Sequence, residues 1–187
     1  MPRIVATSLP DVLVIEPDVY KDVRGFFLET YHAAKYAASG IALPFVQDNH
    51  SRSAERTLRG IHLQIAPAQA KLIRVIRGAV LDVAVDLRVG SSTFGRWVST
   101  ELSEDNFRQL YVPSGFGHAF YVMRGPADLE YKVTALYNPA GEIGVAWNDP
   151  ELAIAWPNPE PILSDRDFRL PRLSAVRDRL LTLTESR

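Results

Sequence analysis

Residues 79–88, AVLDVAVDLR, alternate in character with a period of two, and this pattern restricts the fold of the chain strongly. Leucine and valine occupy the odd positions from 81 to 87, whereas Asp82 and Asp86 stand at even positions. Successive side chains of a β-strand point to opposite faces, so the pattern indicates one apolar and one polar face. We predict a half-buried β-strand here.

Similar short segments recur along most of the chain, separated by glycine, proline and asparagine. They span residues 11–17, 24–31, 94–102, 108–113, 117–123 and 128–137. Many short strands at this spacing are typical of a β-sandwich or barrel. Only residues 31–39 and 173–185 have a helical pattern, and residues 158–173 are expected to form an ordered loop over the β core. The predicted fold is all-β with a few short peripheral helices.

The composition fits a single globular domain over residues 1–187. Hydrophobic residues make up 47% and charged residues 23% of the chain, which allows a substantial core.

The net charge of −1 gives no field that would attract nucleic acid or an anionic membrane. The chain has no cysteine, which excludes disulfides, thiolate nucleophiles and cysteine-based zinc sites. No segment has the ~20 apolar residues of a membrane span, and Pro10 and Asp11 interrupt the region where a signal peptide would be apolar. We therefore expect a cytoplasmic protein.

The segment TLRGIHLQIAPAQAKLIRV, residues 57–75, combines two apolar strands with the basic side chains of Arg59, His62 and Lys71. A charge in a dry core is costly unless it is paired or solvated. Arg59 and His62 would face opposite sides of a regular strand, but a bulge at Gly60 would bring both to one face. We expect this segment to form the inner wall of a barrel that is open to water and to a charged ligand.

The sequence VPSGFGHAF, residues 112–120, places His118 in a Pro-x-Gly-x-x-His pattern. This pattern resembles the second signature of cupins, which are small double-stranded β-helix proteins. In metal-binding cupins the first signature supplies His-x-His, but here Gln64 stands where the second histidine would follow His62. Because a catalytic metal site usually has three strong ligands, we expect no bound metal. His62 and His118 are then candidates for proton transfer or hydrogen bonding.

Blocks along residues 10–172 closely resemble the dTDP-4-dehydrorhamnose 3,5-epimerases of deoxysugar biosynthesis. They occur in order and include RGFFLETY, FVQDNHSRS, LRGIHLQ, KLIRVIRGAVLDVAVDLR, RQLYVPSGFGHAF, EYKVTALYNP and LSDRD. The resemblance implies a metal-free, cupin-like jelly roll that forms homodimers, in which one subunit helps to complete the nucleotide site of the other. It implies inversion of C3 and C5 of dTDP-4-dehydro-6-deoxy-D-glucose to give dTDP-4-dehydro-L-rhamnose, without a cofactor.

The resemblance also assigns roles to four residues. His62 is expected to be the base that removes a proton next to the C4 ketone, and Tyr131 the acid on the opposite ring face. A histidine pKa of ~6.5 lies near working pH, and a tyrosine pKa of ~10 keeps the phenol protonated at pH 7. Asp167 matches the aspartate that pairs with this histidine, and Lys71 matches the lysine beside the C4 oxygen. Taken singly, Tyr131 would be an ordinary core aromatic, and Asp167 or Lys71 a solvated residue.

Further residues are expected to contact the nucleotide or the sugar: Arg24, Phe26, Glu29, Gln47, Asp48, Asn49, Arg59, His118, Tyr137, Glu142 and Arg166. Phe26 and Tyr137 are candidates to pack on thymine. Arg24, Arg59 and Lys71 are expected to meet the diphosphate or the sugar, where an arginine can bind two oxygens at once. The chain departs from the family at Leu63 and Leu136, where aromatics are common, and at Arg166, where lysine is usual. These departures leave open an enzyme that inverts only C3 or C5, or one that acts on another 4-keto-6-deoxy sugar nucleotide.

Two other classes compete with an epimerase: a sugar-binding cupin without activity, and a metal-dependent cupin oxygenase or isomerase. The joint presence of the four residues assigned to catalysis argues against the first. Gln64 in place of a second histidine argues against the second.

Overall fold

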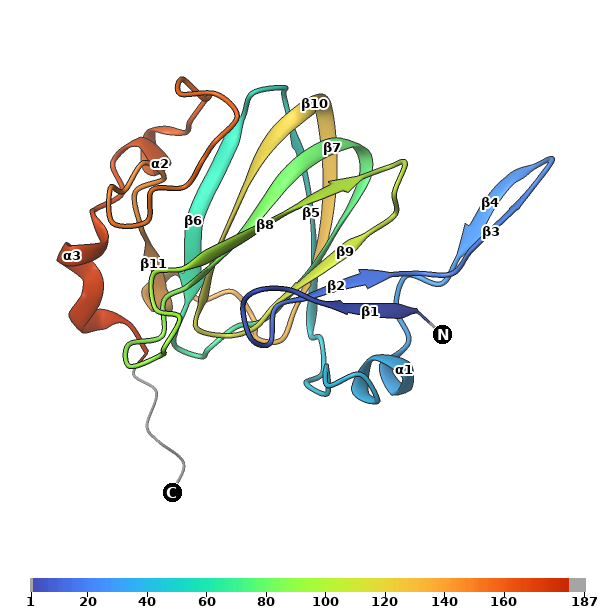
Figure 1. The fold of residues 1–187 in the computed structure, drawn as a ribbon, viewed down its shortest axis with the longest axis horizontal. Coiled ribbons are helices and arrows are strands. Elements are labelled where there is room, and N and C mark those ends of the chain that lie inside the picture. The colour runs from blue at the N-terminus through green and yellow to red at the C-terminus, as the bar shows by residue number, and fades with distance from the viewer. Residues whose placement is uncertain (1, 182–187) are drawn as a thin grey trace.

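The computed structural model describes residues 2–181 and is built mainly from β-strands (Figure 1). In chain order these strands are β1 (Arg3–Ala6), β2 (Leu13–Glu16), β3 (Val19–Asp22), β4 (Gly25–Leu28), β5 (Gln47–Ser53), β6 (Leu58–Gln64), β7 (Lys71–Asp86), β8 (Trp97–Ser103), β9 (Gln109–Val112), β10 (Phe116–Val133) and β11 (Glu142–Gly144). The helices are short: α1 (Ala33–Ala37), α2 (Asp165–Phe168) and α3 (Leu173–Val176), with 3-10 turns η1 (Pro139–Gly141) and η2 (Arg177–Arg179). The prediction of an all-β fold with a few short peripheral helices is confirmed.

The two longest strands, β7 and β10, pair with each other along almost their whole length. Their antiparallel register runs from Lys71 opposite Val133 to Asp86 opposite Phe116. The register shifts in the middle, beside Gly78, whose φ is 79° and whose missing Cβ would lie 2.5 Å from a backbone oxygen of the facing strand. Each half of the β7–β10 pair therefore has its own set of neighbours.

The two halves of this pair are the centres of two β layers. In the first, residues 71–77 and 127–133 are flanked by β9, β2 and β1 on one side and by β5 on the other. In the second, residues 79–86 and 116–124 are flanked by β8 on one side and by β6 and β11 on the other. The layers enclose an interior, as in a jelly roll.

Apolar side chains fill part of this interior and cover both outer faces. The interior cluster joins Ile73 and Leu129 of the first layer to Val80 and Phe120 of the second. A second cluster packs the outer face of the second layer against the C-terminal segment, and a third packs the first layer against α1. Each layer is therefore covered on both of its faces. Successive side chains of a strand pack alternately into the interior and against the outer cover.

The alternation along residues 79–88 predicts a half-buried strand, but in the structure both faces of this part of β7 are buried. The apolar face, with Val83 and Val85, lies against Leu173 and Val176 of α3, and the other face points into the interior. Asp82 and Asp86 are fully buried there, with His118 and Arg88 as partners. Local alternation detects two faces, but it cannot detect that distant segments cover both of them.

Helical segments are shorter than the sequence predicts. The expected helix over residues 31–39 is only α1, and it ends before Gly40, which has a φ of 91°. Residues 173–185 form α3 and η2, and residues 182–185 of that prediction lie outside the described chain. The expected loop over residues 158–173 contains the single turn of α2.

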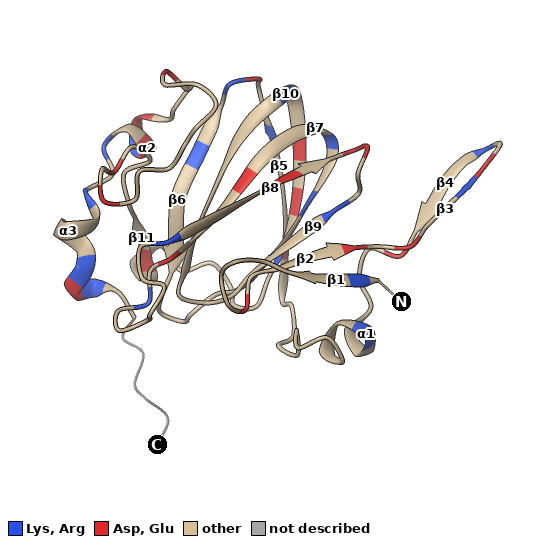
Figure 2. Cartoon of the chain, in the orientation of Figure 1, with Lys and Arg blue, Asp and Glu red and all other residues tan. Residues whose placement is uncertain are grey.

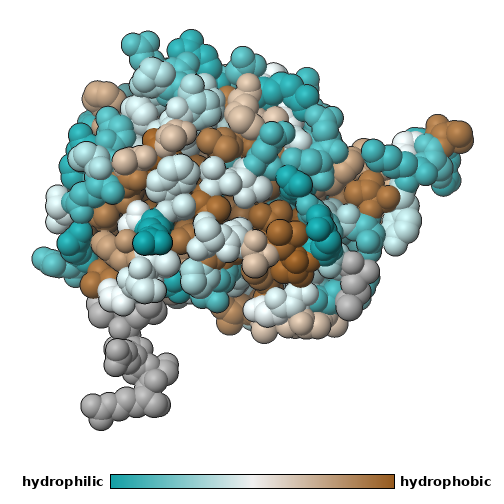
Figure 3. Space-filling view, in the orientation of Figure 1, coloured by the Kyte–Doolittle hydropathy of each residue, from teal (hydrophilic) through white to brown (hydrophobic). Residues whose placement is uncertain are grey.

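Strands β3 and β4 form a separate two-stranded arm that projects from the rest of the molecule (Figure 1). The arm exposes large apolar side chains, with Tyr20 at 64% and Phe27 at 70% exposed. The space-filling view shows apolar surface at its tip (Figure 3). A two-stranded hairpin is marginally stable in water by itself, so an arm of this kind suits contact with a further surface.

Charge is spread over the molecule instead of being gathered on one face. Lysine and arginine alternate with aspartate and glutamate on the sheets and at the loops (Figure 2). Within residues 2–181, none of the helices has the length and apolar character needed to cross a membrane.

Strand β6 carries the bulge that the sequence predicts at Gly60. Arg59 and His62 face Phe120 and His118 of β10, so three steps along β6 match two steps along β10. As a result, Arg59 and His62 line the same cavity. A Cβ at Gly60 would lie 2.6 Å from the Cβ of Ala119, and the φ of Gly60 is 114°.

Gly60→Ala is expected to lower the free energy of unfolding by about 2–5 kcal/mol, because it adds both a clash and backbone strain. Gly95→Ala is the matched control, since Gly95 has a φ of 76° but open space around its missing Cβ. The control should cost only about 1 kcal/mol. Urea unfolding of the two variants measures both values, and equal losses would show that the close approach of β6 and β10 has no energetic weight.

Candidate functional site

A cavity of about 600 Å³ opens between the two β layers. The first layer contributes side chains from β5, β7 and β10, and the second contributes side chains from β6, β11 and the other half of β10. Eleven of the fifteen residues expected to serve in catalysis or binding line it: Gln47, Asn49, Arg59, His62, Lys71, His118, Tyr131, Tyr137, Glu142, Arg166 and Asp167. The structure therefore brings together residues that are up to 120 positions apart in the sequence.

His62 is paired with a buried carboxylate at the cavity wall. Its Nε2 lies 2.7 Å from Oδ1 of Asp167, whose side chain is only 5% exposed. Ser164 caps α2 and accepts a hydrogen bond from the backbone N–H of Asp167, which fixes the carboxylate. Burial alone would raise the pKa of Asp167, but hydrogen bonds led by the one from His62 hold this pKa below its usual value. An ionised Asp167 accepts the proton on Nε2, so Nδ1 is the ring nitrogen left to act as a base.

Lys71, at the start of β7, is a largely buried ammonium. Its Nζ donates a hydrogen bond of 2.7 Å to Oε1 of Gln69. Burial lowers the pKa of Lys71 to about 8, and the negative charge of Glu142 opposes this shift only in part. Lys71 is thus charged at neutral pH but is poorly solvated, so it is suited to stabilise a nearby oxyanion.

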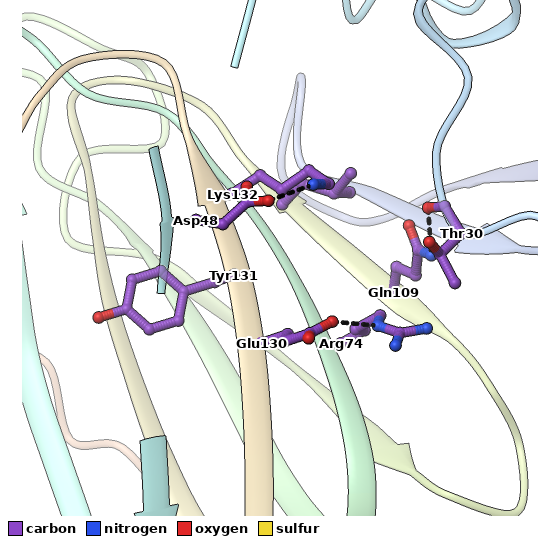
Figure 4. Close-up of a pocket in the computed structure, with 8 residues that line it drawn as sticks. Thr30, Asp48, Arg74, Gln109, Glu130, Tyr131 and Lys132 are labelled. Atoms are coloured by element: carbon purple, nitrogen blue, oxygen red, sulfur yellow. Dashed lines mark hydrogen bonds and ion pairs between the residues drawn. The ribbon is translucent and has the colours of Figure 1, made fainter. Parts of the chain in front are cut away.

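Tyr131 enters the cavity from the first layer, opposite Ile73 of β7. Figure 4 shows its ring pointing away from Lys132 and Asp48, which lie on the outer face of the same layer. Burial raises the pKa of Tyr131, so the phenol keeps its proton at neutral pH. A protonated phenol is therefore held in the cavity on the layer opposite the one that carries His62.

A group of polar side chains surrounds the rim of the cavity. Glu142 binds the guanidinium of Arg166 at 2.6 Å and accepts a hydrogen bond of 3.0 Å from the hydroxyl of Tyr137. Arg59 is tied back to Ser53 by a hydrogen bond of 2.9 Å from its Nε. Two guanidinium groups, those of Arg59 and Arg166, therefore line the same cavity.

Four of the expected residues lie outside this cavity within one chain. Arg24 and Phe26 are on the arm, where Arg24 binds Asp22 and Phe26 packs edge-on against Phe107. Glu29 pairs with Lys35 near α1.

Asp48, the fourth, alternates with Gln47 and Asn49 on β5 and so points outward. It binds Lys132 at 2.8 Å beside a small pocket of about 50 Å³ (Figure 4).

The structure adds residues that sequence reasoning missed. Asp82 is fully buried and holds His118 by contacts of 2.9 and 3.0 Å to Nε2, forming a second histidine–aspartate pair at the cavity wall. The alternation along residues 79–88 assigns Asp82 to a polar face, so the local sequence carries no signal that this carboxylate is buried. Gln64 donates to the carbonyl oxygens of Pro67 and Leu136, and this role has no local sequence signal.

Potential metal ligands do not gather in the described part of the chain. Among residues 2–181 there is no group of three or more histidine, aspartate or glutamate side chains that could hold an ion. His62 and His118, which are Cα partners on adjacent strands, each bind a separate aspartate.

Comparisons with known proteins point to one family. The model of the dTDP-4-dehydrorhamnose 3,5-epimerase family matches residues 6–175. A dTDP-4-dehydrorhamnose 3,5-epimerase from Pseudomonas aeruginosa is 51% identical, over 86% of this chain and 90% of the relative. A dTDP-4-dehydrorhamnose 3-epimerase from Streptomyces niveus is 43% identical, over 94% of this chain and 86% of the relative.

The fold is also found in solved structures. A dTDP-6-deoxy-D-glucose-3,5-epimerase from Legionella pneumophila, in complex with dTDP-4-keto-L-rhamnose, superimposes with a TM-score of 0.95. It is 43% identical, and the match covers 100% of both chains. The cupin-like jelly roll that the sequence resemblance implies is therefore confirmed.

Proposed function

The chain belongs to the dTDP-4-dehydrorhamnose 3,5-epimerase family, and from this premise we propose how its cavity inverts C3 and C5 of dTDP-4-dehydro-6-deoxy-D-glucose. The product is dTDP-4-dehydro-L-rhamnose. The observation that carries the proposal is that His62 and Tyr131 enter one cavity from opposite layers. A sugar ring between the layers would then have a base on one face and an acid on the other.

The C4 ketone of the substrate makes this chemistry possible without an external reactant. Removing a proton from C3 or C5 gives a carbanion that delocalises onto the C4 oxygen as an enolate. Nδ1 of His62 takes the proton, and Asp167 stabilises the resulting imidazolium through Nε2. The hydroxyl of Tyr131 returns a proton to the same carbon from the other face, so its configuration is inverted.

Lys71 is the group that we assign to the enolate oxygen. In the poorly solvated cavity its ammonium interacts with a developing negative charge more strongly than it would in water. Arg59 and Arg166 are assigned to the diphosphate, and Tyr137 to the thymine base. Gln47, Asn49, His118 and Glu142 are assigned to the remaining nucleotide or sugar contacts. The scheme needs no metal and no redox cofactor.

We further propose that the chain works as a homodimer. Arg24, Phe26, Glu29 and Asp48 lie outside the cavity of their own chain, and the arm exposes large apolar side chains that a partner can cover. The proposal is that these residues contribute to the partner's site. Light scattering should give twice the mass of the chain, and a monomeric mass with full activity would contradict this assignment.

We also propose that residues 1–187 fold as one domain in the cytoplasm. The β7–β10 pair runs through both layers, so the layers should unfold in a single transition. The location is inferred from the sequence, which has no apolar segment of the length that a membrane span needs. Two separate unfolding transitions, or recovery of the protein in a membrane fraction, would overturn these two points.

A monoepimerase is the second candidate, because a relative at 43% identity is a dTDP-4-dehydrorhamnose 3-epimerase. Both activities share the base, the acid and the enolate. They differ in whether the ring can present both carbons to the same pair of groups. Leu63, which lines the cavity in place of a common aromatic, is a position that can change this, whereas Leu136 lies outside the cavity lining.

Incubation with dTDP-4-dehydro-6-deoxy-D-glucose in deuterated water tests the function directly. We expect NMR to show deuterium at both C3 and C5 and an inverted product, at the same rate with and without EDTA. Deuterium at only one carbon would identify a monoepimerase. Loss of activity with EDTA and its recovery with a divalent ion would show that the metal-free scheme is wrong.

His62→Asn is expected to reduce exchange at both carbons by about 10²–10⁴-fold, because it removes the general base. Binding of dTDP should remain close to wild type, as measured by calorimetry. His50→Asn is the matched control, since His50 also pairs with an aspartate, Asp128 at 3.3 Å, but points to the outer face. Near-wild-type turnover of His62→Asn would remove His62 from the role of base.

Tyr131→Phe should keep part of the solvent exchange but lose most of the epimerised product. His62 can remove and return a proton on one face by itself, whereas inversion needs a donor on the other face. Tyr111→Phe is the control, because it removes the hydroxyl of a buried tyrosine outside the cavity. Product formation at an undiminished rate, or loss of exchange as complete as in His62→Asn, would each contradict the two-faced scheme.

A further inference from the structure

Gln69 holds the ammonium of Lys71 in place from the loop that precedes β7. Its Oε1 accepts the 2.7 Å hydrogen bond from Nζ, and its Nε2 donates a 2.7 Å hydrogen bond to the carbonyl oxygen of Ala135. Its backbone N–H is bound to the carbonyl oxygen of Gln64 at 3.1 Å. The side chain is buried, and the two hydrogen bonds allow only one orientation of the amide.

Within the described residues, no carboxylate contacts the Lys71 ammonium directly. Among residues 2–181, Lys71 Nζ forms no ion pair within 4.0 Å of a carboxylate oxygen, and the acid that acts on it is the more distant Glu142. Glu142 is itself bound by Arg166 and Tyr137. The other titratable or charged groups of the cavity are Arg59, His62, His118, Tyr131 and Asp167, and the two histidines are bound to their own aspartates.

A neutral acceptor and a charged one would have different effects on Lys71. An amide oxygen orients the ammonium but leaves its positive charge available to a substrate oxyanion. A carboxylate at the same place would orient it equally well, but it would also compensate the charge before the substrate binds. The choice of glutamine over glutamate therefore matters for any step in which Lys71 meets a developing anion.

We propose that Gln69 is a positioning residue that aims the Lys71 ammonium at the enolate oxygen while leaving its charge uncompensated. This inference rests on the proposed role of Lys71 in epimerisation. It assigns to Gln69 no contact with the substrate, since the side chain acts through Lys71.

The proposal predicts the direction in which the pH dependence of the reaction should change. Burial sets the pKa of Lys71 at about 8. The charged form is present below this pH and is lost above it, so kcat/KM should fall as pH rises through about 8. A carboxylate at position 69 favours the ammonium and should raise this pKa. An apolar residue at position 69 removes a favourable contact of the ammonium and should lower it.

The experiment compares Gln69→Glu and Gln69→Leu with the wild type by two measurements. The first is the titration of lysine Cε resonances by NMR, with Lys71 assigned through Lys71→Met. Lys132, on the neighbouring strand and bound to Asp48, is the internal reference. The second is the pH profile of epimerisation between pH 6 and 10. Thermal unfolding checks that each variant is folded.

Gln69→Glu should raise the Lys71 pKa and move the alkaline limb of the profile upward, while kcat on the plateau falls about 10–100-fold. Gln69→Leu should also lower kcat, but with the Lys71 pKa moved downward. Lys132 should be unchanged in both. Full plateau activity in Gln69→Glu, or the same loss in both folded variants without a change in the Lys71 titration, would overturn the proposal. If the wild type does not epimerise the substrate, the proposed function fails, but the two titrations still test the contact between Gln69 and Lys71.

Discussion

The pairing of β7 with β10 is the constraint on which the rest of the molecule depends. Because the pair continues through the bend at Gly78, two strands supply the centre of both layers. Every other strand of the large sheet joins the structure at an edge of that pair or of its neighbours. The relative placement of the two layers, and with it the shape of the cavity between them, therefore depends on one continuous pair of hydrogen-bonded strands. This suits a reaction in which two proton-transfer groups must stay on opposite faces of a ring.

Local patterns in the sequence predict the strands and the bulge, but not which faces of the strands are buried. Alternation along β7 and the turn residues between short apolar segments identify a β-sandwich, and Gly60 predicts the bulge that brings Arg59 and His62 to one face. Local patterns could not predict that segments far away in the sequence cover both faces of a strand. Asp82 looked solvent-exposed because its partner, His118, is 36 residues away. The packing of α3 on the outside of the second layer is equally invisible in a single strand.

The site shows the same division. The resemblance to a family selected His62, Lys71, Tyr131 and Asp167, and the cavity contains all four. The residues that hold them in place could not be found in this way, because their roles arise from hydrogen bonds in the folded state. Ser164 fixes Asp167, and Gln69 fixes Lys71. Arg24, Phe26 and Glu29 illustrate the opposite case, since sequence blocks group them with the site but one folded chain does not.

The contacts of Gln64 limit how readily a barrel of this kind could acquire a metal site. It stands where a metal-binding cupin has its second histidine, and its amide joins two loops by donating to Pro67 and Leu136 and accepting from the backbone of Asn138. A histidine has neither the reach nor the number of donors to keep these three contacts, and each buried group left unpaired costs about 1–3 kcal/mol. At the position where a metal-binding cupin has a ligand, this chain therefore has a residue that links two loops by hydrogen bonds. Acquisition of a metal ligand at this position would first require those loops to be joined by other contacts, so the two chemistries are separated by more than a single substitution.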